Sequence, residues 1–225
     1  MFKVSHYNND FALELNYIFD APDGIYFSFL RLRIFIDSVH EQIISSNEKL
    51  VSELQKEDPE VYSSMLNQLD IDCSLNYFQD FLLQSIFITS YTLLEYKLRD
   101  ICLVCGKHKN KNYKEYRKKN GHKSELSAFK GFLEDILNLN MGSLVDSWNK
   151  LEDYQKLRKS IIHGESEDNI MQLLKFINAK YQIGIDVRST NWNKVFVTDF
   201  IDKSYYLLDE LIKLLNKEYN LISYG

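Results

Sequence analysis

The stretch FLLQSIFITSYTLLEYKLRDICLVC, residues 81–105, is mostly apolar and contains neither Gly nor Pro. A run of this length predicts one long helix, from about residue 75 to residue 104, with Gly106 as its end. The longest uncharged part covers residues 81–94, which is 14 residues, and it includes Gln, Ser and Thr. It is too short and too polar for a membrane span, so we expect a helix of the protein core.

A second long helix is predicted from Ile25 to about residue 55, where apolar side chains recur every three or four residues. Residues 1–24 show no clear period and end in the turn sequence Ala21-Pro22-Asp23-Gly24, so we expect them to be irregular. Shorter helices are predicted after Pro59 and over residues 124–139, 144–163, 168–179 and from 198 or 199 to about 219.

The composition favours the same fold class. Only 8 Gly and 2 Pro occur in 225 residues, too few for the many turns of a sandwich or barrel. Alternating and β-prone residues near 182–197 predict one small β-hairpin. The sequence therefore predicts a single all-α domain over residues 1–225, an antiparallel helical bundle of two long helices plus shorter ones.

The sequence also indicates a cellular compartment. Three Cys residues cannot form a fully paired disulfide framework, and the N-terminal residues MFKVSHYNNDF contain no long apolar run typical of a signal peptide. We therefore expect a soluble, cytoplasmic protein without membrane contact.

The charge is unevenly distributed. Residues 107–123 (KHKNKNYKEYRKKNGHK) hold eight Lys and Arg but one Glu, whereas the rest of the chain holds 19 basic and 31 acidic residues. The segment contains no apolar period, which indicates a loop or a frayed helix. It is either a solvated connection or a grip on a phosphate backbone, with Lys114, Arg117, Lys118 and Lys119 as candidate RNA contacts.

One predicted helix, residues 144–163, carries a charge on its apolar side. On a helical wheel Arg158 falls among Leu151, Tyr154 and Ile162. A guanidinium there must find a carboxylate, extend to solvent, or face a cleft or a subunit interface. His163 lies in the last turn before Gly164, a common place for a capping or surface residue.

The segment LRKSIIHG, residues 157–164, places His163 five residues after Arg158 and just before a Gly. Together with the upstream helix and its uncharged residues 81–94, it resembles the HEPN superfamily, all-α domains of which many are RNA-cleaving toxins or phage-defence effectors. Their motif is an Arg followed four to six residues later by a His near the end of a late helix. Arg117 and His122 have the same spacing, but they lie in a polar segment without an apolar frame.

The resemblance implies a metal-independent endoribonuclease without cofactors, acting as a homodimer on RNA, with an antitoxin or another defence-system partner. Arg158 would bind the scissile phosphate, His163 would act as general base or acid, and Lys159 and Lys156 would hold flanking RNA. The products would carry 2′,3′-cyclic phosphate and 5′-hydroxyl ends. Lys159 departs from the family pattern, in which a small polar residue usually follows the Arg.

Two other hypotheses remain open at this point. The chain is either a non-catalytic HEPN-like module that binds RNA, a nucleotide or a protein, or a helical scaffold in which Arg158 forms a buried ion pair. Cys102, Cys105 and His108 have spacing that zinc could use, but core packing is the simpler interpretation of two Cys on an apolar helix. No metal ligands are therefore assigned.

Overall fold

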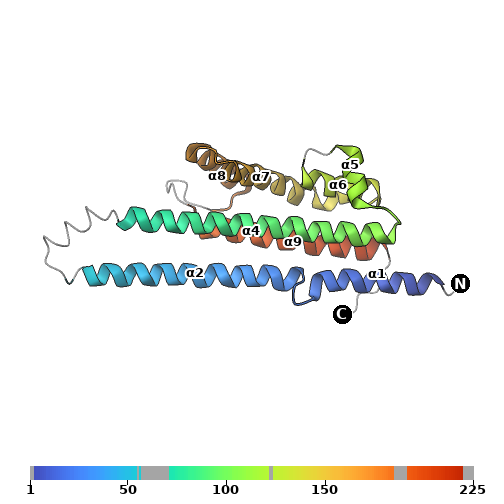
Figure 1. Cartoon of the computed structure of the whole chain (residues 1–225), viewed down its shortest axis with the longest axis horizontal. Helices are drawn as coiled ribbons and strands as arrows, with labels where there is room; N and C mark the ends of the chain where they lie inside the picture. Colours follow the sequence, from blue (N-terminus) through green and yellow to red (C-terminus); the bar gives the residue numbers. More distant parts are fainter. Residues whose placement is uncertain (1–2, 55, 57–70, 122–123, 185–191, 220–225) are drawn as a thin grey trace.

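The computed structural model of the chain describes residues 3–54, 56, 71–121, 124–184 and 192–219. All regular structure in these ranges is helical, so the predicted all-α class is confirmed (Figure 1). In chain order the helices are α1 (Lys3–Asp20), α2 (Ile25–Leu54), α4 (Ile71–His108), α5 (Tyr113–Asn120), α6 (Glu125–Asp135), the 3₁₀ helix η1 (Met141–Leu144), α7 (Val145–Ile162), α8 (Glu167–Tyr181) and α9 (Lys194–Glu218).

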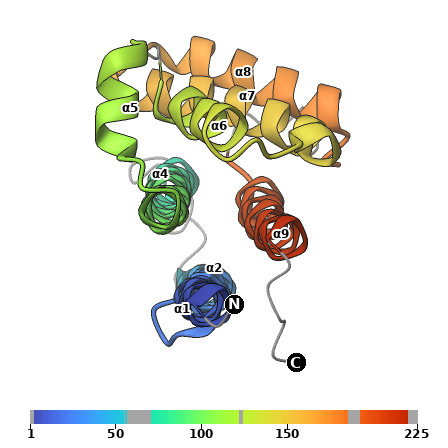
Figure 2. The same cartoon turned by 90° about the vertical axis from the view of Figure 1, so that its right-hand side faces the viewer.

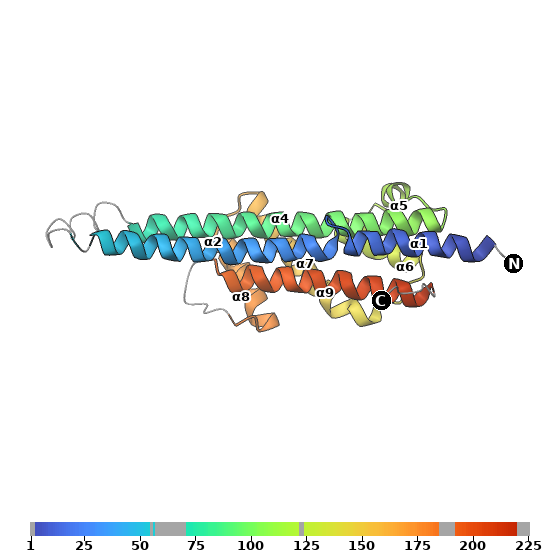
Figure 3. The ribbon, with the colours of Figure 1, turned by 90° about the horizontal axis from the view of Figure 1, so that it is seen from below.

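The helices form a long layer and a shorter one. In the long layer, α1 and α2 follow one another in nearly the same direction, and α4 and α9 run beside them in the opposite direction (Figures 1 and 3). The shorter layer, α5 to α8, covers α4 and α9 on the side away from α1 and α2 (Figure 2). Helices α7 and α8 pack on each other and cross the long layer, so α7 lies across α4.

Helix α4 remains continuous although it contains many polar residues. Four Ser and Thr hydroxyls each donate to the carbonyl oxygen four residues earlier, over distances of 2.7–2.9 Å, and these residues are Ser85, Thr89, Ser90 and Thr92. Satisfied in this way, their hydroxyls need no partner on another helix. The polar residues therefore do not interrupt α4, while its apolar residues pack on several neighbours.

Aromatic side chains fill the junction of α4, α7 and α9. Phe87 of α4 and Tyr154 of α7 each lie with their ring centroid 4.9 Å from that of Phe200 of α9. Trp192, just before α9, adds a fourth ring at 5.6 Å from Phe87. All four side chains are buried, so this cluster holds the shorter layer on the longer one.

The N-terminal segment differs from the prediction. Residues 1–24 were expected to be irregular, but α1 occupies most of them. Phe11, Leu15 and Ile18 recur at four- and three-residue spacing and are buried. The pattern is only about two turns long and follows a polar run, which is why it did not stand out as a period.

The end of α4 also differs. Gly106 was expected to terminate the helix, yet the helix continues to His108. A Cβ on Gly106 would lie 2.7 Å from the carbonyl oxygen of Lys111, whose N–H donates to the Gly106 carbonyl at 2.8 Å. Glycine is required there for a close approach of the returning backbone, and the left-handed residue of this turn is Asn110.

The predicted β-hairpin near 182–197 is wrong in its second half. Residues 194–197 form the first turn of α9, because the Asn193 side chain accepts from the Val195 N–H at 2.7 Å and caps the helix. The helix therefore starts earlier than the predicted caps Thr198 or Asp199. The described residues contain no strand, and both residues 185–191 and the helix predicted at Pro59 lie outside them.

The remaining predicted helices agree with the structure within a few residues, and Ser124 caps α6 with a reciprocal capping box to Ser127. Within the described part of the chain, no helix combines the length and hydropathy that a membrane span requires.

The aromatic junction generates a test of the packing. Phe87→Ala should lower the free energy of unfolding by about 3 to 4 kcal/mol, because it leaves a cavity among three buried rings. The matched control is Phe176→Ala on α8, where the ring is 51% exposed, and it should cost no more than about 0.5 kcal/mol. Urea denaturation of both variants measures the difference. Equal losses would contradict the assigned core.

Candidate functional site

Helix α7 is positioned by its apolar side. Trp148, Leu151, Tyr154 and Leu157 are buried, and the Tyr154 hydroxyl donates to Asp199 of α9 at 2.8 Å. Lys150, also buried, pairs with the same carboxylate at 2.7 Å. These contacts fix the rotation of α7, so Arg158, one turn after Tyr154, faces α4.

Arg158 lies between an aromatic ring and a carboxylate of α4. Its guanidinium carbon lies 5.2 Å from the ring centroid of Tyr91, and Nη2 lies 3.5 Å from Oε2 of Glu95. The Arg158 side chain is 21% exposed, and its buried Nε–H has no hydrogen-bond partner among the described residues. The sequence predicted that Arg158 would pair with a carboxylate, extend to solvent or face a cleft or an interface. In the structure it pairs with the Glu95 carboxylate, and one edge of its side chain stays accessible.

Burial governs the electrostatics of this pair. It raises the pKa of the Glu95 carboxyl above its ordinary value, although the nearby Arg158 guanidinium acts in the opposite direction. Burial likewise raises the pKa of the Tyr91 hydroxyl. The Glu95 carboxylate is therefore costly to keep ionised, and the Arg158 guanidinium offsets part of that cost.

His163 ends α7 as predicted. Its backbone N–H donates to the Lys159 carbonyl at 2.9 Å, and Gly164 takes the left-handed conformation with φ of 64°. The Glu165 N–H then closes the turn on the Ser160 carbonyl at 3.0 Å. The His163 side chain is exposed, and no contact among the described residues joins it to Arg158.

The two lysines of α7 differ in their surroundings. Lys156 pairs with the buried carboxylate of Asp153 at 2.7 Å, and Lys180 reaches the other oxygen of Asp153 at 2.6 Å. Lys159 is exposed and close enough to Glu95 to stabilise its ionised form. Of the two predicted RNA contacts, Lys159 lies by Arg158, whereas Lys156 belongs to a separate ion-pair network.

The described part of the basic segment, residues 107–121, contains the end of α4 and the short helix α5, so the helical alternative applies to α5. Asn112 caps α5 by accepting from the backbone N–H groups of Lys114 and Glu115, and Gly121 ends the helix in the left-handed conformation. Exposed side chains of α5 include Lys114, Lys118 and Lys119. The structure thus presents these three predicted contacts together on one short helix.

The other predicted contact of α5, Arg117, is paired with Glu125 of α6 at 2.5 Å. The interleaved tyrosines serve the protein itself: Tyr113 stacks on Phe129 with centroids 5.3 Å apart, and Tyr116 donates to Asp135 at 2.5 Å. Neither tyrosine presents a free face for stacking on a base, so α5 offers charge rather than an aromatic platform.

Two residues near Arg158 were missed by the sequence reasoning. Tyr91 and Glu95 lie four residues apart, which places them on one side of α4. A signal was available, because Glu95 is the first charge after a run of 14 uncharged residues. Its partner on α7 could not be identified without the crossing of the two helices.

A pocket of about 300 Å³ lies beside the α7–α8 turn. Asp80, Phe81 and Gln84 of α4 line it together with Glu165, Glu167, Ile170, Met171 and Trp192. Asp80 accepts from the Trp192 N–H at 2.8 Å. Burial raises the pKa of Asp80 to about 6, with Glu167 adding to the effect, so this pocket holds a carboxyl that ionises with difficulty.

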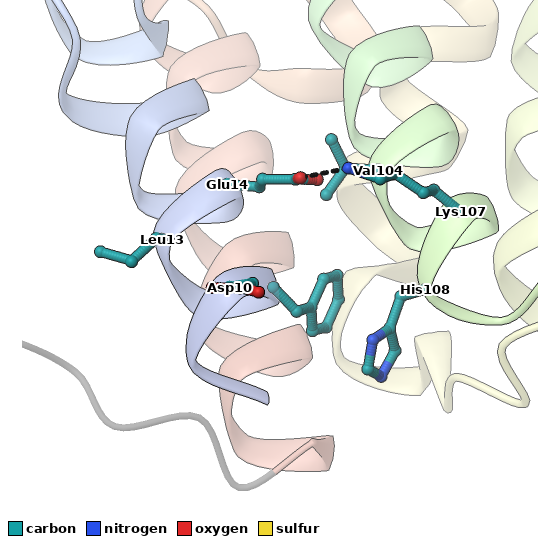
Figure 4. A pocket seen from close by; sticks show the side chains of 7 residues that line it. Asp10, Leu13, Glu14, Val104, Lys107 and His108 are labelled. Carbon is teal, nitrogen blue, oxygen red and sulfur yellow. Dashed lines mark hydrogen bonds and ion pairs between the residues drawn. The ribbon is translucent and has the colours of Figure 1, made fainter. Parts of the chain in front are cut away.

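The cysteines of α4 pack in the core. Cys102 and Cys105 are buried, and burial raises the pKa of both thiols. His108 instead stacks on Phe11 of α1, with ring centroids 4.1 Å apart, at a pocket of about 320 Å³ that Glu14 and Lys107 bridge (Figure 4). No three His, Cys, Asp or Glu side chains of the described residues are arranged to hold a metal ion, and His122 lies outside these residues.

Comparisons of the chain with protein-family models, with curated proteins and with solved structures each find no match.

The Arg158–Glu95 pair should contribute to stability. Arg158→Met leaves a poorly solvated carboxylate and should cost about 2 to 3 kcal/mol, whereas Glu95→Gln should cost about 1 kcal/mol. A double-mutant cycle in urea should give a coupling energy of about 1 kcal/mol. The exposed pair Lys49 and Glu53, 4.0 Å apart, is the control and should give less than about 0.5 kcal/mol. Equal coupling in both cycles would contradict a role for the pair.

Asp80 should make stability depend on pH. Because the folded protein raises the pKa of this carboxyl from 3.8 to about 6, its contribution is fully present below about pH 4 and is lost as the pH rises through about 6. Asp80→Asn keeps an acceptor for the Trp192 N–H without a charge. We compare the free energy of unfolding of the variant with that of wild type at each pH. With a discount for solvent screening, this difference should favour the variant by on the order of 1 kcal/mol more at about pH 7 than at about pH 4. Urea denaturation at both pH values measures this gain, and parallel pH profiles would refute it.

Proposed function

We propose that this chain is a HEPN-like antiparallel helical bundle that cleaves RNA without a metal ion, as an effector of a toxin–antitoxin or phage-defence system. The observation that carries the proposal is the way in which Arg158 is held and exposed. A rigid helix holds it on an aromatic ring, one carboxylate contacts it at 3.5 Å, and an edge stays accessible one turn before an exposed His. Those are the two side chains that the motif requires.

The chemistry follows from these residue types. An imidazole can both accept and donate a proton, so His163 suits removal of the ribose 2′-hydroxyl proton or donation of a proton to the leaving 5′-oxygen. The Arg158 guanidinium matches two phosphate oxygens and stabilises the charge that develops on them. Attack of the 2′-oxygen on phosphorus breaks the bond to the 5′-oxygen and forms a 2′,3′-cyclic phosphate and a 5′-hydroxyl.

The two side chains diverge within one chain. Arg158 faces α4, whereas His163 lies about 140° further around the helix and about 7.5 Å along it. A homodimer would resolve this, because a two-fold axis near the end of α7 places Arg158 of one copy by His163 of the other. Ile162, which is 50% exposed next to His163, is an apolar residue that such a contact would cover.

Flanking RNA would be held by exposed lysines. Lys159 lies beside the Arg158 site, and Lys114, Lys118 and Lys119 of α5 lie in the same layer (Figure 2). Arg117 and Lys156 would first have to leave Glu125 and Asp153. The Arg117 side chain is 52% exposed but that of Glu125 only 20%, so this exchange leaves a partly buried carboxylate without its cation.

Two observations favour a second candidate, a non-catalytic RNA-, nucleotide- or protein-binding module. Arg158 already has Glu95 as a partner, and no contact links it to His163 among the described residues. Lys159 cannot accept a hydrogen bond as the small polar residue of the family pattern does. A pure scaffold would also contain the Arg158–Glu95 pair, but it would not bind RNA.

Cleavage of labelled tRNA and mRNA in EDTA tests the proposal. Wild type should give 2′,3′-cyclic ends, and His163→Ala should reduce the rate at least about 100-fold. Its free energy of unfolding should change by less than about 1 kcal/mol, because the side chain is exposed. The control is His40→Ala, on α2 and away from α7, which should retain full activity.

The other outcomes separate the hypotheses. Arg158→Lys keeps the charge but loses the bidentate geometry, so it should bind RNA and cleave it slowly. Binding without turnover by folded wild type would support the binding module. If wild type neither binds nor cleaves RNA and Arg158→Met loses much of its stability, the scaffold hypothesis is supported.

A further inference from the structure

Arg158 offers only one pair of nitrogen atoms to an anion that arrives from solvent. A guanidinium binds two phosphate oxygens either through Nε and one terminal nitrogen or through the two terminal nitrogens. The side chain as a whole is 21% exposed, but its Nε atom is buried. The first arrangement is therefore closed, and a bidentate phosphate must use Nη1 and Nη2.

Nη2 is the nitrogen that Glu95 already contacts, with Oε2 at 3.5 Å. The Glu95 side chain is only 13% exposed, and it lies on α4, which is packed between α1, α2 and the shorter layer (Figure 2). It therefore has little room to turn away from Arg158. An ionised Glu95 and a phosphate would share one nitrogen as neighbouring like charges, an arrangement that strongly favours the protonated form of a carboxyl.

The other influences on Glu95 leave it sensitive to an added anion. Burial raises the pKa of its carboxyl, and Glu125 of α6 acts in the same direction. Arg158 and Lys159 of α7, together with Arg99 of α4, oppose this shift without cancelling it. A phosphate would bring one more negative charge, and it would therefore add to the effect of burial and of Glu125.

We infer that Glu95 controls the binding of phosphate to Arg158. While it is ionised, Glu95 competes with phosphate for Nη2, and phosphate occupies the guanidinium only after Glu95 has bound a proton from solvent. The neutral carboxyl then becomes an O–H donor that can contact a phosphate oxygen. This role of Glu95 rests on the proposed function only in that Arg158 is a phosphate ligand, and it requires neither RNA cleavage nor a dimer.

A purely structural role of Glu95 predicts the opposite sign. If the carboxylate only held Arg158 in place, removal of its charge would release the guanidinium and weaken phosphate binding. If the carboxylate competes with phosphate, the same change strengthens phosphate binding. Glu95→Gln removes the charge but keeps the size and shape of the side chain, so the direction of the change in affinity distinguishes the two roles.

Binding of a 2′-O-methyl RNA oligonucleotide, which cannot be cleaved by attack of a 2′-oxygen, tests the sign. At about pH 8, Glu95→Gln should bind it at least about tenfold more tightly than wild type, because the variant needs no proton. The matched control is Glu152→Gln, which removes an exposed carboxylate of α7 and should change the affinity less than about threefold. Fluorescence anisotropy at one fixed salt concentration measures the dissociation constants, and far-UV circular dichroism confirms that each variant is folded.

Two further comparisons identify the proton and the site. The advantage of Glu95→Gln over wild type should shrink to less than about twofold by about pH 5, where Glu95 of wild type is itself protonated in the complex. Titrations that both proteins share cancel in this ratio. In an Arg158→Met background the advantage should disappear at every pH, because the nitrogen for which Glu95 and phosphate compete is absent.

The outcomes separate this role from the proposed function. Tighter binding by Glu95→Gln that depends on Arg158 and on pH supports the role, whether or not wild type cleaves RNA. Equal or weaker binding by folded Glu95→Gln overturns the role and leaves the cleavage assay unaffected. A gain of equal size in Glu152→Gln, or one that persists at about pH 5 or in the Arg158→Met background, overturns it as well. If wild type and Glu95→Gln both fail to bind at about 100 µM protein, Arg158 is not a phosphate ligand, and the role and the proposed function both fail.

Discussion

The burial of α4 is the constraint on which the rest of the structure depends. This helix contacts α1, α2, α5, α6, α7 and α9, so its apolar residues must serve several neighbours at once. Each ionisable side chain that it turns inward then needs a partner on another element. Asp80 binds the Trp192 N–H before α9, Glu95 pairs with Arg158 of α7, and buried Lys97 donates to the Asp23 carbonyl in the α1–α2 turn. Three polar residues thus position three elements.

Arg158 satisfies a structural demand without using all of its hydrogen-bonding capacity. A guanidinium has five N–H donors, and the Glu95 contact at 3.5 Å engages it loosely. Tyr91 supports the flat face of the group, and this contact consumes no donor. An anion approaching the exposed edge would therefore meet unused donors on a side chain already held in place. Such a group suits phosphate binding better than a fully bonded buried ion pair would.

The fold class could be predicted from the sequence because helical periodicity is a local property of the chain. The extent of α2 was predicted within one residue at each end, since its apolar spacing is regular and Gly24 precedes it. Gly106 was misread because its role depends on Lys111 approaching from a later turn, which no local pattern records. Residues 194–197 were misread because β-propensity is weak beside an N-cap such as Asn193.

The candidate site was predictable to the same degree. Arg158 and His163 stood out through their spacing, the apolar frame and the terminal Gly, and the exposed end of α7 agrees with that expectation. Tyr91 and Glu95 did not, because pairing between α4 and α7 is set by the angle at which the helices cross. Tyr113 and Tyr116 anchor α5 on α6, since a short helix without its own apolar side needs such anchors.

The distribution of charge then limits how RNA could approach. The chain outside residues 107–123 is strongly acidic, and screening restricts any attraction to about 8 Å at physiological salt. The exposed lysines of α5 therefore act only on their own neighbourhood, at one end of the α5–α8 layer (Figure 1). The α1–α2 side exposes Asp10, Asp20 and Asp23, and these carboxylates disfavour a phosphate backbone there.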